Sequence, residues 1–172
     1  MLARVDTELY ADAVEFCPLQ EHSDLMMCAT YQLDEAAKQR LGRLYVFDTS
    51  QDRLRELQRI DGAGTLDIKW SILDGSRAWL GQAAADGSLT LRQLRALDHV
   101  EAPALDGSVA LDRDGVSVSL NDDDDDDGES STIALSLDWD NYRQPTYEAE
   151  DPGGDGARVL IDASSALHRH TL

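Results

Sequence analysis

One pattern of three elements recurs along the chain, and it restricts the possible folds more than any other feature. Each copy begins with a short strand that ends near an aromatic residue. A more apolar strand follows, and then a turn leads into a third, alternating strand. The aromatic residues are Phe16, Trp70 and Trp139. Short strands separated by turn residues are typical of all-β folds, and an ordered repeat of unlike elements is typical of a β-propeller.

The first copy is the most regular. Its strands are expected at 11–18, 25–31, 41–48 and 53–60. Alternation of Ala13 and Glu15 with Val14 and Phe16 predicts a half-buried first strand. The second strand is apolar on both faces, as expected for a strand between two packed neighbours. The segment 53–60 supplies an outer strand, although its leucine spacing also suits a helical turn.

The second copy has expected strands at 65–70, 78–84 and 88–94, and the third at 133–140, 159–163 and 164–168. An Asp86-Gly87 turn precedes the last strand of the second copy, because both residue types tolerate a positive φ.

We therefore predict an all-β chain that forms part of a WD-repeat β-propeller, about two and a half to three blades over residues 1–172. Blade 1 is expected at about 10–61, blade 2 at about 62–105, an acidic insertion at about 106–130 and a partial blade 3 at about 131–172. A generic antiparallel sandwich is the alternative fold, but it has no reason to repeat the same triplet of elements.

The charge of the chain restricts its partners. The net charge is −19, from 34 acidic and 15 basic residues. Contact with nucleic acid or anionic lipid relies on Lys and Arg, so neither partner is expected. No apolar run approaches the roughly 20 residues that span a bilayer, and the first residues lack the features of a secretory signal. We expect a cytoplasmic protein in which Cys17 and Cys28 are reduced core thiols.

Individual candidates for chemistry are few. Asp12 and Glu15 lie near a strand end, where a carboxylate can act as a general base or simply hold the strand by hydrogen bonds. His22 can titrate near neutrality, although a histidine in a polar turn is usually solvated. His168 and His170 fall on one face of a strand and suggest a metal pair, but no third ligand is near, and no metal is expected.

Two further groups of residues suggest binding sites, and each also has a purely structural explanation. Trp70, Trp79 and Trp139 suggest a sugar or cation platform, yet at repeated positions they are expected in the core. The run Asp122–Asp127 resembles a calcium-binding stretch only in composition, because such a loop needs glycine and spaced ligands. Contiguous like charges more often form a solvated segment.

Several stretches carry a resemblance to a known family: 12–19, 28–33, 40–45, 66–70 and 135–139. In content, order and spacing they resemble the diphthine methyl ester hydrolases, the WD-repeat enzymes of diphthamide biosynthesis. The resemblance covers residues 6–94 and 133–168, and the segment 95–132 has no counterpart.

This resemblance implies hydrolysis of the methyl ester of methylated diphthine on translation elongation factor 2, without a cofactor. The catalytic residues stay unknown, because the chain holds neither a G-x-S-x-G elbow nor an HExxH pattern. A non-catalytic WD-repeat scaffold for protein partners is the alternative function, since propellers host many activities.

The number of copies predicts how the isolated chain behaves. A closed propeller usually needs about four to eight blades, so this chain is expected to be part of a longer one and inactive alone. Open sheet edges expose unpaired backbone groups, and we expect the isolated chain to associate or aggregate. Size-exclusion chromatography tests this, and a stable, cooperatively unfolding monomer would contradict it.

Overall fold

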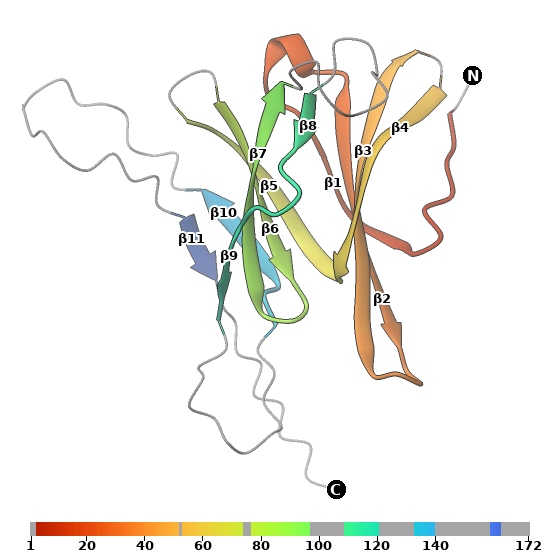
Figure 1. The fold of residues 1–172 in the computed structure, drawn as a ribbon, viewed down its shortest axis with the longest axis vertical. Helices are drawn as coiled ribbons and strands as arrows, with labels where there is room; N and C mark the ends of the chain where they lie inside the picture. The colour runs from red at the N-terminus through yellow and green to blue at the C-terminus, as the bar shows by residue number, and fades with distance from the viewer. Residues whose placement is uncertain are drawn as a thin grey trace, which may run out of the picture.

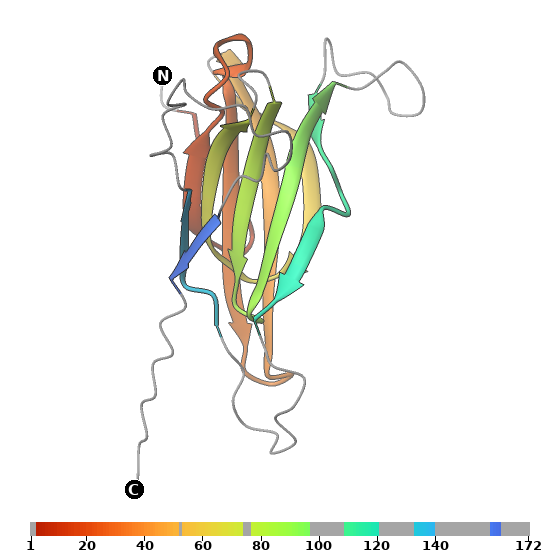
Figure 2. The same cartoon turned by 90° about the vertical axis from the view of Figure 1, so that its left-hand side faces the viewer.

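The computed structural model describes residues 3–51, 53–73, 77–96, 109–120, 133–139 and 159–162. In these residues the chain is all-β with antiparallel pairing, apart from one short 3-10 turn, η1 (Gln20–His22). The strands form three groups that stand side by side (Figure 1, Figure 2). The described residues do not form a closed ring of sheets.

The first sheet is a four-stranded meander in sequence order. Its strands are β1 (Tyr10–Phe16), β2 (Leu25–Asp34), β3 (Gln39–Gln51) and β4 (Arg53–Ala63). A bulge interrupts the β1–β2 pairing between Ala11 and Ala13. The segment 53–60 is a strand, so the helical turn that its leucine spacing also allowed is excluded.

The second sheet contains β5 (Thr65–Leu73), β6 (Arg77–Ala84), β7 (Ser88–Ala96), β8 (Val109–Leu111) and β9 (Val116–Ser119). The β6–β7 turn is the expected one: Gly87 has a φ of 78°, and Asp86 Oδ1 accepts a hydrogen bond from Ser88 N at 2.9 Å. Both β8 and β9 pair with β7. The segment 106–130, expected as an insertion, therefore contributes two outer strands to this sheet.

The third group is a pair, β10 (Ser136–Trp139) and β11 (Val159–Asp162). These two strands lie within the ranges expected for the third copy. The strand expected at 164–168 lies outside the described residues.

The first strands of the three groups are neighbours in space, because β1 and β10 both lie against β5. The second sheet is therefore covered on both faces. Its contact with the first sheet forms the larger core, which includes Leu25, Met27, Leu44, Val46, Ile68, Leu80 and Leu94. On its other face a second core unites Ala83, Leu89, Ala134, Leu137 and Trp139.

Each aromatic repeat residue has a defined orientation within this arrangement. Trp139 of β10 packs against the second sheet, and Trp70 of β5 packs against the core shared with the first sheet. No other described strand covers Phe16 of β1 in this way: Phe16 is 53% exposed, and Val14 is 50% exposed. The expected alternation along this strand is confirmed, and its more covered side carries Ala13 and Glu15.

The outer face of the first sheet is covered only in part. Cys28, Tyr45 and Phe47 form a small buried cluster there, with the two rings stacked at 5.4 Å. The N-terminal segment reaches this face, where Tyr45 Oη donates to Thr7 O at 2.8 Å and Arg43 pairs with Glu8 at 2.5 Å.

Two glycines that pair across β3 and β4 differ in the space around them. A Cβ on Gly42 would lie 2.5 Å from Thr30 O and 2.6 Å from Ala63 O, whereas a Cβ on Gly62 would meet nothing within 4 Å. We predict that Gly42→Ala lowers the free energy of unfolding by about 1–3 kcal/mol, because backbone atoms cannot yield as a side chain can. Urea unfolding measures the change.

Gly62→Ala is the matched control, and it should be neutral or stabilising by up to about 1 kcal/mol, because alanine restricts the unfolded chain. Equal effects of the two substitutions would contradict the close approach of β2, β3 and β4 at Gly42.

Candidate functional site

Charged side chains form a row across β1, β5 and β10, the neighbouring first strands of the three groups. Its members are Glu15 of β1, Lys69 of β5 and Asp138 of β10, and each directly precedes the aromatic repeat residue of its strand. Lys69 Nζ lies 2.5 Å from Glu15 Oε1 and 3.7 Å from Asp67 Oδ1. The row therefore has alternating charges, and it connects strands that are more than 50 residues apart in sequence.

Hydrogen bonds hold β10 against β5 beside this row. Leu137 N donates to Asp67 Oδ2 at 3.1 Å, and Trp139 Nε1 donates to Lys69 O at 3.0 Å. Asp138 Oδ1 accepts a hydrogen bond from Trp139 N at 2.8 Å, which fixes the carboxylate near its own backbone. The first two of these bonds use polar groups of β5, the Asp67 carboxylate and the Lys69 carbonyl.

The electrostatics of the row favour a charged lysine. The hydrogen bond that Lys69 donates to Glu15 raises the pKa of Lys69 above its ordinary 10.5. Partial burial opposes this rise, and the charges of Asp67, Glu15 and Asp138 add to it. Lys69 and Glu15 keep 40% and 30% of their side-chain surfaces exposed, so the row is accessible to solvent. Its chemistry is that of an ion pair that positions carboxylates, since Lys69 occupies an oxygen of Glu15.

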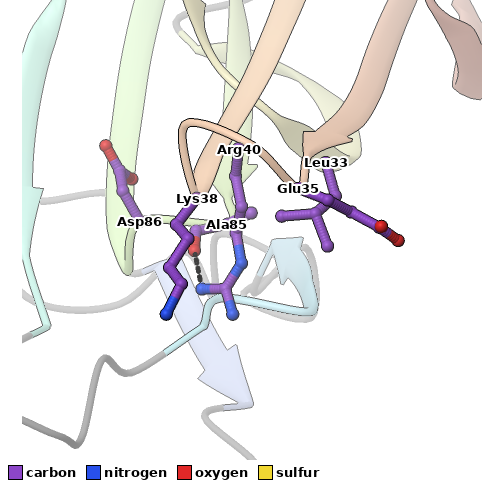
Figure 3. A pocket seen from close by; sticks show the side chains of 6 residues that line it. All are labelled: Leu33, Glu35, Lys38, Arg40, Ala85 and Asp86. Atoms are coloured by element: carbon purple, nitrogen blue, oxygen red, sulfur yellow. Dashed lines mark hydrogen bonds between the residues drawn. The ribbon is translucent and has the colours of Figure 1, made fainter.

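A cavity of about 650 Å³ lies at one end of the contact between the first and second sheets. Its lining comes from the β2–β3 hairpin and from the β6–β7 turn: Leu33, Glu35, Lys38, Arg40, Ala85 and Asp86 (Figure 3). The cavity is thus formed by two turns from separate copies of the repeat.

Local hydrogen bonds fix both walls of this cavity. In the hairpin, Asp34 Oδ1 accepts bonds from Ala36 N and Ala37 N at 3.0 Å each, and Lys38 closes the turn with a φ of 51°. Arg40 Nη1 donates to Ala85 O at 3.0 Å. The backbone continues the connection, because Gly64 N donates to Arg40 O at 2.8 Å and Ala85 N donates to Gly64 O at 2.7 Å.

The structure separates the residues that the sequence offered as candidates. Glu15 belongs to the charged row, whereas Asp12 is exposed on β1 and His22 ends the short 3-10 turn. His168, His170 and Asp122–Asp127 lie outside the described residues. Among the residues that the structure describes, no group of three or more His, Cys, Asp or Glu is arranged to hold a metal ion.

The three tryptophans do not form a common platform. Trp70 packs into the core on one face of the second sheet, and Trp79 and Trp139 pack into the core on the other face. The indole nitrogens of Trp70 and Trp79 are buried without a hydrogen-bond partner in the described part of the chain.

Both cysteines are free and buried, which confirms the expectation of core thiols. Burial raises the pKa of the Cys17 and Cys28 thiols, so both are poor nucleophiles.

Lys69 and Asp138 were not among the sequence candidates, although the repeat itself marks them. Each stands one position before an aromatic repeat residue, as Glu15 does. Comparison of the three copies position by position would have identified the row. The cavity residues have no equivalent signal, because each turn looks ordinary until the two are brought together.

Comparison with known proteins decides the relationship of this chain. The human protein described as diphthine methyltransferase is 36% identical over an alignment of 195 residues, which covers 99% of this chain and 38% of that protein. The mouse protein of the same description is 37% identical over 137 residues, 70% of this chain and 29% of that protein. The chain is homologous to the diphthine methyltransferases.

The Schizosaccharomyces pombe protein of that description is 32% identical over 90 residues, 52% of this chain and 27% of that protein. This chain thus spans well under half the length of each of these relatives. No protein-family model and no solved structure matches it. No helix in the described residues is long and apolar enough to cross a membrane.

The Glu15–Lys69 pair predicts a pH dependence of stability. A lysine whose folded pKa is raised stabilises the fold at pH values below its unfolded pKa, and this contribution disappears as the pH rises through the folded pKa. When the pH is raised from about 9 to about 11.5, the free energy of unfolding of the Glu15→Gln variant should therefore fall by less than that of the unsubstituted chain. Urea midpoints at the two pH values measure the difference.

Glu21→Gln serves as the control. Glu21 is exposed in the 3-10 turn, and its substitution removes the same charge as Glu15→Gln. If both variants lose the same stability as the unsubstituted chain, Glu15 does not set the titration of Lys69.

Proposed function

We propose that this chain is part of a longer cytoplasmic WD-repeat protein of diphthamide biosynthesis, which removes the methyl ester from methylated diphthine on translation elongation factor 2. The observation that carries the proposal is homology over 99% of the chain to a human protein named for diphthine. The stretches 12–19, 28–33 and 40–45, which carry the family resemblance, form β1, β2 and β3 with their turns.

The packing of the sheets supports the propeller part of the proposal. In a propeller each blade packs face to face on the next, and the first strand of every blade lies nearest the axis. Here β1, β5 and β10 are neighbours, and Trp139 and Trp70 each pack against the preceding sheet. Phe16 holds the equivalent position on β1 and is 53% exposed. We infer that a further sheet of the longer protein covers Phe16 and Val14.

The proposed reaction is hydrolysis, and it differs from the transfer that the relatives' name describes. Water adds to the ester carbonyl, the C–O bond to the methoxy group breaks, and a carboxylic acid and methanol are formed. Methyl transfer instead adds a methyl group from a donor. Ester hydrolysis needs an activated water and stabilisation of the oxyanion. In the proposed enzyme the charged row fixes the relative positions of the first strands. Glu15 contributes to this positioning through its ion pair with Lys69.

A single assay distinguishes the two reactions. The full-length protein is incubated with elongation factor 2 that carries methylated diphthine, in water enriched in heavy oxygen. We predict that the diphthine peptide loses one CH₂ unit, that its new carboxyl gains one heavy oxygen, and that methanol appears. Mass spectrometry of the peptide and assay of methanol measure these changes.

The same substrate without its ester, supplied with a methyl donor, is the second arm. Gain of a methyl group there would identify a transferase, and no change in either arm would favour a scaffold that only binds elongation factor 2. The 172-residue chain, tested in parallel, is expected to leave the ester intact, because its described strands do not form a closed ring.

A further inference from the structure

The outer face of the first sheet is covered unevenly. Phe16 of β1 pairs with Met26 of β2, and Met26 pairs with Phe47 of β3, so the two phenylalanines lie in one row on the same face. Phe16 is 53% exposed, whereas Phe47 and its stacked neighbour Tyr45 are each 1% exposed. Arg59 of β4 lies over the Tyr45 ring, 5.1 Å from its centroid, which leaves the hydroxyl end of the ring to be covered from elsewhere. What lies at that end therefore decides how far the apolar surface of this face extends.

The segment 6–9, which precedes β1, lies at the hydroxyl end of Tyr45. Figure 1 shows the chain before β1 (red) running beside β3 and β4, on the side away from the second sheet. Tyr45 Oη donates to Thr7 O at 2.8 Å. Arg43 of β3 donates from Nη1 to Glu8 Oε2 at 2.5 Å. The segment is thus held against this face by one hydrogen bond to its backbone and one ion pair to its side chain.

The backbone of this segment is strained and depends on contacts from outside. Glu8 has a φ of 63°, in the left-handed region that residues other than glycine, asparagine and aspartate seldom adopt. Asp6 Oδ1 accepts a hydrogen bond from Glu8 N at 2.9 Å, and this bond shapes the turn. Thr7 Oγ1 donates to Leu9 O at 2.7 Å. The pairing of β1 begins at Tyr10, so the segment lies outside the strand ladder. A strained conformation of this kind persists only where the surrounding structure fixes it.

Arg43 supplies this external fixation. Its Nε donates to Asp61 Oδ1 of β4 at 2.8 Å, which orients the guanidinium toward Glu8. Arg59 Nη1 lies 3.9 Å from Glu8 Oε1 and adds a weaker attraction. The hydrogen bond and the charge of Arg43 lower the pKa of the Glu8 carboxyl, so Glu8 is ionised near neutral pH. Glu8 nevertheless keeps 61% of its side-chain surface exposed, and an ion pair this accessible is weak and sensitive to salt.

We propose that residues 6–9 are a strap that opens and closes over the outer face of the first sheet, and that the Glu8–Arg43 pair holds it closed. In the closed state the strap covers the hydroxyl end of Tyr45. In the open state the strained turn relaxes, and the exposed apolar surface around Phe16 extends across the face to Tyr45 while both sheets stay folded. The strap thereby sets how much of this face is available for contact. It is separate from the charged row and from the cavity, and it does not depend on the proposed hydrolysis.

Hydroxyl-radical labelling of the chain tests this proposal. The radical adds oxygen to solvent-exposed aromatic rings whatever the charge around them, and mass spectrometry of the peptides measures the extent at each tyrosine. In the unsubstituted chain Tyr10, which is 75% exposed, should react readily and Tyr45 only weakly. Glu8→Gln should raise the labelling of Tyr45 relative to Tyr10 several-fold, and raised salt should do the same in the unsubstituted chain. Cys17, buried in the core between the two sheets, should stay unreactive toward iodoacetamide, which shows that the sheets remain folded.

Two further variants refine the test. Glu21→Gln removes the same charge from the exposed 3-10 turn and should leave the labelling of Tyr45 unchanged. Glu8→Asn also removes the carboxylate, but asparagine tolerates a positive φ. Glu8→Asn should therefore raise the labelling of Tyr45 less than Glu8→Gln does.

Other outcomes would overturn the proposal. Unchanged labelling of Tyr45 in the Glu8→Gln variant would show that the Glu8–Arg43 pair does not hold the segment. An increase that appears only together with alkylation of Cys17 would report unfolding of the sheets instead of opening of a strap. Equal labelling of Tyr45 in the Glu8→Asn and Glu8→Gln variants would contradict relaxation of the strained turn as part of the opening.

Discussion

Face-to-face burial of the second sheet is the constraint on which the rest of the structure depends. Successive side chains of a strand point to opposite faces, so a sheet with apolar residues on both faces needs a neighbour on each side. The second sheet has two such neighbours: Ile68 and Leu80 are fully buried against the first sheet, and Ala83 is fully buried toward β10. Within the described part of the chain the first sheet has one such neighbour, and Phe16 stays half exposed. Covering one such side chain contributes about 1–3 kcal/mol, which favours a further sheet at this face.

Polar contacts fix the placement of one sheet along another, which apolar burial alone does not. Burial of hydrocarbon surface is not directional, so it does not fix how one sheet is placed along another. In this chain the Arg40, Gly64 and Ala85 hydrogen bonds fix one end of the contact between the sheets, and Lys69 with its partners fixes the line of first strands. A half-exposed ion pair adds little stability, so the value of Glu15 and Lys69 lies in the relative placement of β1 and β5.

The strands could be predicted from the sequence because their periodicity is local. Which face of each strand is covered by a neighbour could not be predicted. Alternation along β1 is clear in the sequence, but it does not tell which side meets a neighbour, and Val14 and Phe16 turned out to be exposed. The short strands β8 and β9 were missed because they are only three and four residues long and lie next to an acidic stretch. Of the candidate site, Glu15 was found as a strand-end carboxylate, but its partner Lys69 depends on a contact across 54 residues.

Arg92 explains how such a weakly apolar segment is kept on the second sheet. Val116 and Val118 of β9 are mostly exposed, so burial alone does not hold this strand. Arg92 of β7 is buried, and desolvation lowers its pKa. A buried cation is costly unless its hydrogen bonds are made.

The guanidinium makes these bonds to the side-chain oxygen of Gln82 at 3.1 Å and to the backbone carbonyls of Asp112 and Arg113 between β8 and β9. Because the buried guanidinium of Arg92 requires these hydrogen bonds, the β8–β9 connection is held against β7. From there β9 leads to Leu120, whose backbone N donates to Gly87 O of the β6–β7 turn at 2.9 Å.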